Sequence, residues 1–198
     1  MGPMQEIGTL LIQTVGSLYL FIIVLRFLLQ LARADFYNPI SQFAVKATNP
    51  LLIPLRRMIP GVFGIDIASL VLALALQFVV IEVSAMIIGY AFINPLSVVV
   101  WSLIGLLSMT TTIFFWGLLV VVISSWIAPH SNNPALLLTR QLVEPVMAPF
   151  RKLMPDMGGI DISPIFAFLA LNVVQVLIKH LAGAAGMSPA VRSLVMGI

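Results

Sequence analysis

Cysteine is absent from the chain, which excludes disulfide bonds, thiolate metal sites and thiol catalysis. Charge is also scarce, because Asp, Glu, Lys and Arg together make up 9% of the 198 residues, whereas soluble domains carry about 25%. Hydrophobic residues fill 61% of the chain and the mean hydropathy is +1.12. This composition predicts an all-α integral membrane protein.

The sequence also lacks the residue patterns of common active sites. It has no glycine-rich phosphate loop, no set of residues spaced as metal ligands, and no nucleophile, base and orienting group in register. The only two histidines, His130 and His180, fall at opposite sides of the membrane in the topology predicted below. We therefore expect no enzyme, no catalytic residue, no cofactor and no metal.

The formal net charge of +3 does not indicate a nucleic-acid partner. The basic residues lie beside apolar segments, where they set membrane orientation and meet anionic head groups. We expect the lipid bilayer, and no nucleic acid, as a partner. The N-terminus lacks a basic segment and the apolar run behind it is too long for a signal peptide, so we interpret it as a true span.

The chain contains one pattern twice, at an offset of 95 residues. Each copy has an Asn-Pro pair, then spaced prolines, a pair of cations, a further proline and Gly-Ile-Asp-Ile, which indicates a duplication. The matched loop residues are Pro50, Pro54, Arg56, Pro60, Gly64 and Asp66 in the first copy and Pro145, Pro149, Arg151, Pro155, Gly159 and Asp161 in the second.

A membrane span needs about 20 apolar residues, and four segments qualify. Repeat 1, residues 1–93, has predicted spans at about 7–32 and 67–92 around a loop at 33–66. Repeat 2, residues 94–198, has predicted spans at about 98–128 and 163–180 around a loop at 129–162. The segment 98–128 is too long for one upright helix, so we predict either a tilted span or a short interfacial piece before a span from about 110.

Lysine and arginine concentrate in the two loops, whereas the N-terminus and the Asn94-Pro95 joint carry none. The positive-inside rule then places both loops in the cytoplasm and both termini in the periplasm. Both units point the same way, so we expect two parallel repeats rather than inverted ones.

Each loop is predicted to begin with a short amphipathic helix in the membrane interface, capped by Asn38-Pro39 or Asn133-Pro134. A second, shorter element follows at 51–58 or 146–154, because Pro54 and Pro149 should limit any helix there to a turn or two. The cation pairs at the end of these elements are candidates to contact lipid or a partner protein; they are Arg56, Arg57, Arg151 and Lys152.

Two interpretations of Asp66 and Asp161 stay open. Each aspartate can cap the following span and form an ion pair with Arg56 or Arg151. Alternatively, the two aspartates line a shared cytoplasmic mouth near the pseudo-axis between the repeats. The spacing does not separate these alternatives.

Polar residues at membrane depth are costly and often functional; those here are Arg26, Gln77, Glu82, Asn172 and Gln175. By depth, Gln77 is the better partner for Arg26, and Gln77 matches Asn172 at the 95-residue offset. These two amides either join helices through a hydrogen bond or line a polar pathway, with Gln175 on the same side of its helix as Asn172. Glu82 has no obvious partner, so it is protonated, paired with another protein, or placed at a water-filled site.

The repeated Asn-Pro, Pro-x-x-x-Pro-x-Arg-[Arg/Lys]-x-x-Pro and Gly-Ile-Asp pattern resembles the YggT (YlmG) family, over nearly the whole chain. The first loop, with Asp35-Phe36-Tyr37-Asn38-Pro39, is similar to that of proteobacterial members with two units. The resemblance implies a bacterial inner-membrane protein without an established activity, from a family linked to osmotic tolerance, ion homeostasis, cell division and envelope organisation. Ala68-Ser69 departs from the Ser163-Pro164 form of the second loop.

We expect a non-enzymatic scaffold or assembly factor that presents its two loops to head groups and to other inner-membrane proteins. The alternative is an ion channel or transport accessory that uses Glu82 and the Gln77 and Asn172 positions. Four spans make a thin bundle, so a pore would require several copies of the chain, and a homo-oligomer stays open.

Overall fold

The computed structural model describes residues 2–62, 64–153 and 161–198. Within these ranges the chain forms helices and no named β-strand. Four helices are long and apolar enough to span a membrane: α1 (Pro3–Leu31), α3 (Ile67–Ile87), α4 (Pro95–Ile127) and α6 (Ser163–Ala184). The other helices are α2 (Pro39–Met58), α5 (Pro134–Leu153) and the short α7 (Pro189–Arg192). The predicted all-α fold with four spans is confirmed.

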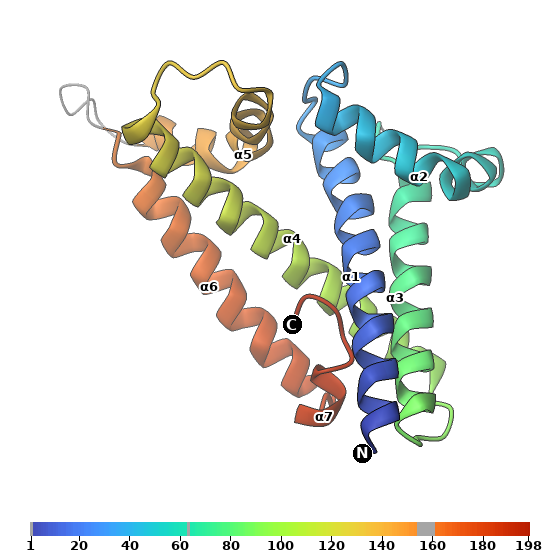
Figure 1. Cartoon of the computed structure of the whole chain (residues 1–198). Helices are drawn as coiled ribbons and strands as arrows, with labels where there is room; N and C mark the ends of the chain where they lie inside the picture. The colour runs from blue at the N-terminus through green and yellow to red at the C-terminus, as the bar shows by residue number, and fades with distance from the viewer. Residues whose placement is uncertain (1, 63, 154–160) are drawn as a thin grey trace.

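The two repeats run in the same direction. Helices α1 and α3 form one antiparallel pair and α4 and α6 form another, and each pair carries its connecting helix, α2 or α5, at the same end (Figure 1). We call this the loop end; the opposite end holds the N-terminus, the α3–α4 connection and α7 (Figure 1). The repeats are therefore parallel, as predicted.

The long third apolar segment is a single helix. α4 runs without a break from Pro95 to Ile127, so the interpretation of 98–128 as an interfacial piece plus a span is wrong and the segment is one helix. At 1.5 Å per residue α4 is about 50 Å long, well beyond the hydrocarbon thickness of a bilayer. It crosses the molecule obliquely and contacts α3 and α1 of the other repeat as well as α5 and α6 (Figure 1).

The two loop helices are also longer than predicted. Pro50 and Pro54 lie inside α2, and Pro145 and Pro149 lie inside α5, so the second, shorter element of each loop does not exist as a separate unit. Each internal proline removes one backbone hydrogen bond. Burial of a stripe on each helix against the spans offsets that loss; Leu52 and Met147 belong to these stripes.

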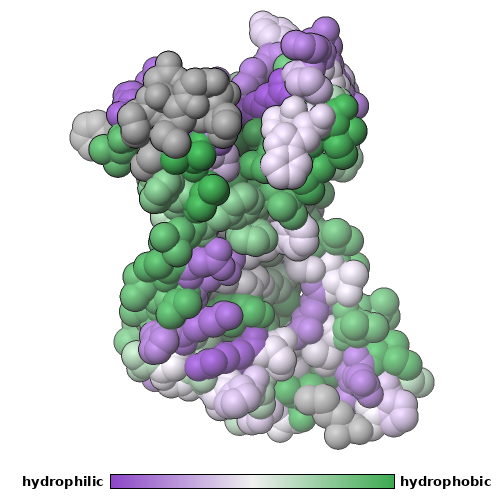
Figure 2. Space-filling view, turned by 90° about the vertical axis from the view of Figure 1, so that its left-hand side faces the viewer, coloured by the Kyte–Doolittle hydropathy of each residue, from purple (hydrophilic) through white to green (hydrophobic). Residues whose placement is uncertain are grey.

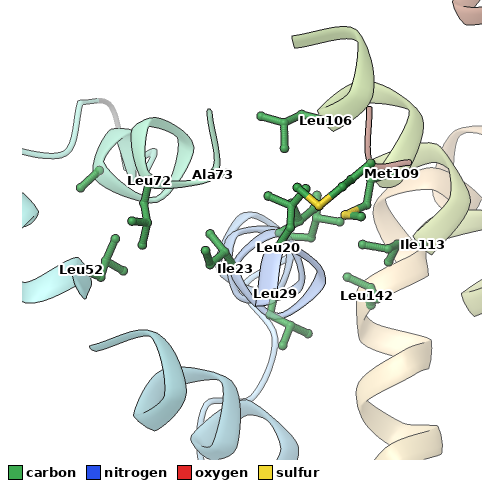
Figure 3. Packing of buried hydrophobic residues seen from close by; sticks show 14 of the residues in the cluster. Leu20, Ile23, Leu29, Leu52, Leu72, Ala73, Leu106, Met109, Ile113 and Leu142 are labelled. Carbon is green, nitrogen blue, oxygen red and sulfur yellow. The ribbon is translucent and has the colours of Figure 1, made fainter. Parts of the chain in front are cut away.

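The largest apolar core surrounds α1. Leu20, Ile23 and Leu29 of α1 point toward side chains of α3 on one side and of α4 and α5 on the other (Figure 3). The cluster thus includes residues of both repeats, and the labelled partners of α1 are Leu52, Leu72, Ala73, Leu106, Met109, Ile113 and Leu142. One smaller cluster packs α6 against α4 and includes Ile81 of α3, and another packs α5 against α4 and α6.

The segment after α7 folds back between the repeats, and its end lies at mid-height of the molecule (Figure 1). The Nε2 of Gln77 donates a hydrogen bond to the Met196 carbonyl at 3.0 Å, and the Ser108 hydroxyl donates to the Gly197 carbonyl. This close approach requires a glycine at position 105, because a Cβ there would lie 2.8 Å from the backbone carbonyl oxygen of Met196.

Candidate functional site

The candidate site at the loop end begins with two matched helix caps. The Oδ1 of Asn38 accepts a hydrogen bond from the Ile40 N–H at 3.0 Å, and the Oδ1 of Asn133 accepts one from the Ala135 N–H at 2.8 Å. A proline follows each asparagine as the first helical residue, where its missing N–H carries no penalty. The predicted Asn-Pro caps are confirmed in both repeats.

The four candidate cations are exposed at the opposite ends of these helices. Arg56 and Arg57 lie in the last turn of α2, and Arg151 and Lys152 in the last turn of α5. Positive charge at a helix C-terminus is stabilised by the helix dipole. All four side chains therefore lie at the loop end and are accessible to water, lipid or a partner.

Asp66 links the end of α2 to the start of α3. Arg56 Nη2 lies 2.5 Å from Asp66 Oδ2, and Asp66 Oδ1 accepts from the Ser69 N–H at 3.3 Å. Asp66 is only 5% exposed. Burial by itself would raise the pKa of this carboxyl, but hydrogen bonds from Arg56 and Ser69 outweigh it and hold the pKa below its ordinary value.

Asp161 forms the corresponding contacts in a far more open setting. Its Oδ1 accepts from the Ser163 N–H at 2.9 Å, and its Oδ2 lies 3.4 Å from Arg151 Nε. Hydrogen bonding from Ser163, with a smaller contribution from Arg151, lowers the pKa of Asp161 against a weak opposing effect of burial. Its side chain is 48% exposed. The ion pairs of both aspartates are confirmed, and Asp66 also caps α3, whereas the N-cap of α6 is Ile162 rather than Asp161.

The two loops touch each other through other residues. Asn38 Nδ2 donates to the Pro134 carbonyl at 2.7 Å, and the Asp35 N–H donates to Gln141 Oε1 at 2.8 Å. Within the described residues, each aspartate bonds to groups of its own repeat. The loop ends are thus joined at the starts of α2 and α5, rather than at the two aspartates.

Gly64 and Pro60, which close the loop of repeat 1, are among the residues that the structure describes. Gly64 has a φ of +80°, a conformation that L side chains rarely adopt, so a glycine is required there. α2 ends at Met58, two residues before Pro60. Their predicted counterparts Pro155 and Gly159 lie outside the described residues.

The buried arginine of α1 has a different partner from the one predicted. Arg26 Nη1 donates to Asn49 Oδ1 at 2.9 Å, to the Val45 carbonyl at 3.4 Å and to the Thr48 hydroxyl. Gln77 is not its partner, because α2 lies over the end of α1 and brings its polar side chains to Arg26, whereas Gln77 faces the segment after α7.

Gln77 and Asn172 do not meet, although their positions match. Gln77 is fully buried against Met196, whereas Asn172 is exposed on α6 and donates to the Phe168 carbonyl of its own helix at 2.8 Å. Figure 1 shows α3 and α6 on opposite flanks of the molecule, with α4 between them. The predicted bond between the two amides within one chain is wrong for that reason.

α6 carries a polar stripe on an otherwise apolar surface. Asn172 and Lys179 are exposed and Gln175 is half-buried, while Leu169, Val173 and Val176 nearby are exposed apolar residues. The face seen in Figure 2 shows hydrophilic residues gathered below mid-height among hydrophobic ones. An exposed amide near the middle of a span is unfavourable against lipid, so this face is suited to a protein neighbour.

Glu82 lies near the end of α3 that is away from the loops. Its Oε2 accepts from the Ile93 N–H in the α3–α4 connection at 3.5 Å, and its buried Oε1 has no partner among the described residues. The order of the residues provides no reason to connect Glu82 with Ile93, because that contact depends on how the α3–α4 connection folds back.

Thr48 and Asn49 are polar contact residues that were not among the residues predicted from the sequence. A signal for them was present: Arg26, Thr48 and Asn49 occur together in repeat 1, and the matched positions of repeat 2 hold Val121, Val143 and Glu144. Three polar residues that are replaced together in a duplicated unit indicate one shared contact.

The fold and the loop-end geometry define a multi-pass membrane protein made of two parallel helical repeats. The CCB3/YggT family matches residues 5–87 and 100–182, so both repeats of the chain belong to this family.

Relatives of known sequence support the same assignment. The chain is 54% identical over 181 residues to an uncharacterised protein of Pseudomonas aeruginosa, covering 89% of this chain and 91% of the relative. It is 40% identical over 181 residues to the uncharacterised protein YggT of Escherichia coli K12, covering 90% of this chain and 92% of the relative. An uncharacterised protein of Haemophilus influenzae is 37% identical over 169 residues, which are 82% of this chain and 88% of the relative. No solved structure matches the chain.

Proposed function

We propose that this protein is a non-enzymatic scaffold or assembly factor of the bacterial inner membrane, with its two loops on the cytoplasmic side. One observation carries the proposal: two amphipathic helices lie at one end of the bundle and expose Arg56, Arg57, Arg151 and Lys152 there. Arginine and lysine at a membrane surface attract anionic lipid by about 1 kcal/mol each.

The exposed surface of α2 fits a position in the membrane interface. Phe43 and Leu51 are exposed apolar residues, while Ser41, Ala44 and Thr48 face inward. An apolar surface next to cations is the combination that seats a helix among lipid head groups. Held in this way, the loops would present a fixed cationic surface to a partner protein.

The partner within the membrane would be another inner-membrane protein or a second copy of this chain. The exposed amide of Asn172, midway along α6, offers such a partner a hydrogen bond. Interhelical hydrogen bonds in membranes average about 0.6 kcal/mol, so this contact would guide the orientation of the partner more than its affinity.

No observation favours the channel alternative over the scaffold. Gln77 is sealed by Met196, Asn172 is on an outer face, and Glu82 faces Ile93 in a connection. The three residues of the proposed pathway therefore lie at separate places in the chain rather than along one path.

The scaffold proposal is tested by crosslinking in the native membrane, mild purification and mass spectrometry of the proteins recovered. The variants are Arg57→Gln with Lys152→Gln, and the fourfold variant that also carries Arg56→Gln and Arg151→Gln. Glu6→Gln is the charge control, because it removes an exposed charge near the opposite end and lies outside the α6 stripe.

We expect a stoichiometric partner with the wild type and with Glu6→Gln, and a stepwise loss of that partner in the double and fourfold variants. Growth at high osmolarity, which the family resemblance makes the relevant phenotype, should decline in the same order. Unchanged partner recovery and unchanged growth in a fourfold variant that still inserts and folds would refute the proposal.

A further inference from the structure

Arg26 is a buried cation whose hydrogen-bond partners are all neutral. It is 4% exposed, and its Nη1 bonds to a carbonyl, a hydroxyl and an amide oxygen of α2. Its Nε has no partner among the described residues, and none of their carboxylates lies within ion-pair distance of it. A buried charge without a counterion is strongly unfavourable, so an anion at this position would stabilise the protein.

Arg26 also lines a cavity that can hold such an anion. A cavity of about 570 Å³ lies between α1, α2 and the loop that leads to α3. Its polar and glycine lining consists of Arg26, Gln30, Arg56, Gly61, Gly64 and Asp66. Two arginines and one aspartate leave the described lining with a net positive charge.

The chemistry of this lining selects a particular kind of anion. Guanidinium groups match the spacing of phosphate oxygens and can bond to two of them at once. Gly61 and Gly64 carry no side chain, so the backbone leaves room close to a ligand. We propose that this cavity binds a phosphate group, with Arg26 as its buried anchor and Arg56 as its partly exposed second contact.

Two sources of the phosphate group can reach this position. Arg26 lies near the end of α1 at the loop end, where the apolar span gives way to α2 and its exposed cations. That depth is accessible to the head group of an anionic phospholipid and to free phosphate from water. The binding chemistry is the same, so the experiment below distinguishes the sources.

Repeat 2 provides an internal control, because it lacks the features that make this site. Val121 replaces Arg26 and Ser125 replaces Gln30 at the 95-residue offset. Glu144 replaces Asn49 and forms an ion pair with Arg151 at 2.8 Å, which adds negative charge. The site is therefore specific to repeat 1. It does not rest on the scaffold proposal, since Arg26 plays no part in partner capture there.

The test uses the full chain in an uncharged detergent at constant ionic strength without chloride. The thermal unfolding midpoint is followed by tryptophan fluorescence while one of three probes is titrated: inorganic phosphate, dioctanoyl phosphatidylglycerol or dioctanoyl phosphatidylcholine. The variants are Arg26→Gln, which removes the anchor, and Val45→Phe. Val45 also lines the cavity, so the larger side chain fills it while both arginines stay in place. The matched control is Val121→Gln in repeat 2.

We expect phosphate, phosphatidylglycerol or both to raise the midpoint of the wild type and of Val121→Gln, and phosphatidylcholine to raise it far less. Loss of hydrogen bonds from a charged group should weaken binding by about tenfold or more in Arg26→Gln. Val45→Phe should show a similar loss of binding. If Arg26→Gln does not fold, Val45→Phe alone tests whether the anion binds in this cavity. A response to phosphatidylglycerol alone assigns the site to lipid, and a response to phosphate alone assigns it to the free anion.

The proposal is overturned if neither anionic probe raises the wild-type midpoint. It is also overturned if Arg26→Gln and Val45→Phe respond as strongly as the wild type, because the stabilising anion would then bind elsewhere.

Discussion

The same arginine–aspartate pair closes the loop in both repeats, but its surroundings differ. Asp66 is buried and bonds to Arg56 and Ser69, whereas Asp161 is half-exposed and Arg151 divides its bonds between Asp161 and Glu144. An ion pair in water contributes little to stability, while breaking a buried pair leaves an uncompensated charge. One duplicated motif can therefore stabilise one repeat strongly and the other weakly.

A second difference lies where α2 and α5 cross the ends of the spans. α2 contributes Thr48 and Asn49 to Arg26, whereas α5 contributes Val143 to an apolar cluster with Leu118 and Ala167. Repeat 2 thus holds its loop helix by apolar burial where repeat 1 also uses buried polar contacts. The predictions below test this difference, from the largest expected effect to the smallest.

Removing the acceptors of Arg26 should have the largest effect. Among the described residues, the double variant Thr48→Val with Asn49→Leu leaves the buried guanidinium with the Val45 carbonyl as its remaining acceptor. It should lower the free energy of unfolding by about 3 kcal/mol. Chemical unfolding in detergent micelles measures the change. Thr139→Val on α5 is the control, because the hydroxyl of Thr139 donates to the Ala135 carbonyl of the same helix. An equal loss in both variants would contradict the special role of Thr48 and Asn49.

Removing the charge of the buried aspartate should have the second largest effect on the free energy of unfolding. Asp66→Asn weakens the bond to Arg56 and should lower the free energy of unfolding by about 2 kcal/mol, less than for a fully buried pair because Arg56 is partly exposed. The matched variant Asp161→Asn should lower it by about 0.5 kcal/mol or less. Parallel unfolding titrations of the two variants check the order, and a larger effect at Asp161 would reverse the comparison.

Close packing within repeat 1 should be sensitive to a single methyl group. A Cβ at Gly16 would lie 2.7 Å from Val80 Cγ2, so Gly16→Ala should lower the free energy of unfolding by about 1 kcal/mol. In repeat 2 the matched residue is Thr111, which already has a side chain. Gly8→Ala is the control, because its Cβ would make an ordinary contact with Ile87 at 3.6 Å. Thermal midpoints of the two variants should separate them.

The pH dependence of stability should come mainly from repeat 1. The pKa of Asp66 is lowered in the folded protein, so its contribution is present above the unfolded pKa of about 3.9 and is lost as the pH falls through the lower folded value. The unfolding midpoint should therefore decrease on acidification below about pH 4. Asp66→Asn should flatten this dependence more than Asp161→Asn, and identical profiles for the two variants would argue against the difference in burial.

The smallest effect is expected at the exposed cations next to the ion-paired arginines. Arg57→Gln and Lys152→Gln should each change the free energy of unfolding by less than about 0.5 kcal/mol, because both side chains are exposed. Unfolding titrations check this expectation. A loss above about 1 kcal/mol in either variant would mean that the residue supports its loop rather than presents a charge.

The sequence alone was enough to predict the spans, the parallel repeats and the Asn-Pro caps, and it offered the two aspartate ion pairs as one of two alternatives. These features depend on hydrophobic runs, on a repeated pattern and on residues close together in the chain, such as Arg56 and Asp66. Their physical causes are local, or act through the bilayer, and are therefore visible in the order of the residues.

Only the tertiary structure decided which distant groups meet. In the tertiary structure, α2 continues through Pro50 and Pro54. Thr48 and Asn49 accept hydrogen bonds from Arg26, and Gln77 bonds to Met196 instead of Asn172. The reason is that a polar group within a bundle bonds to whichever neighbour packing brings near it. The depth of a polar residue along its helix limits its possible hydrogen-bond partners, but the lateral arrangement of the helices determines which of them it contacts.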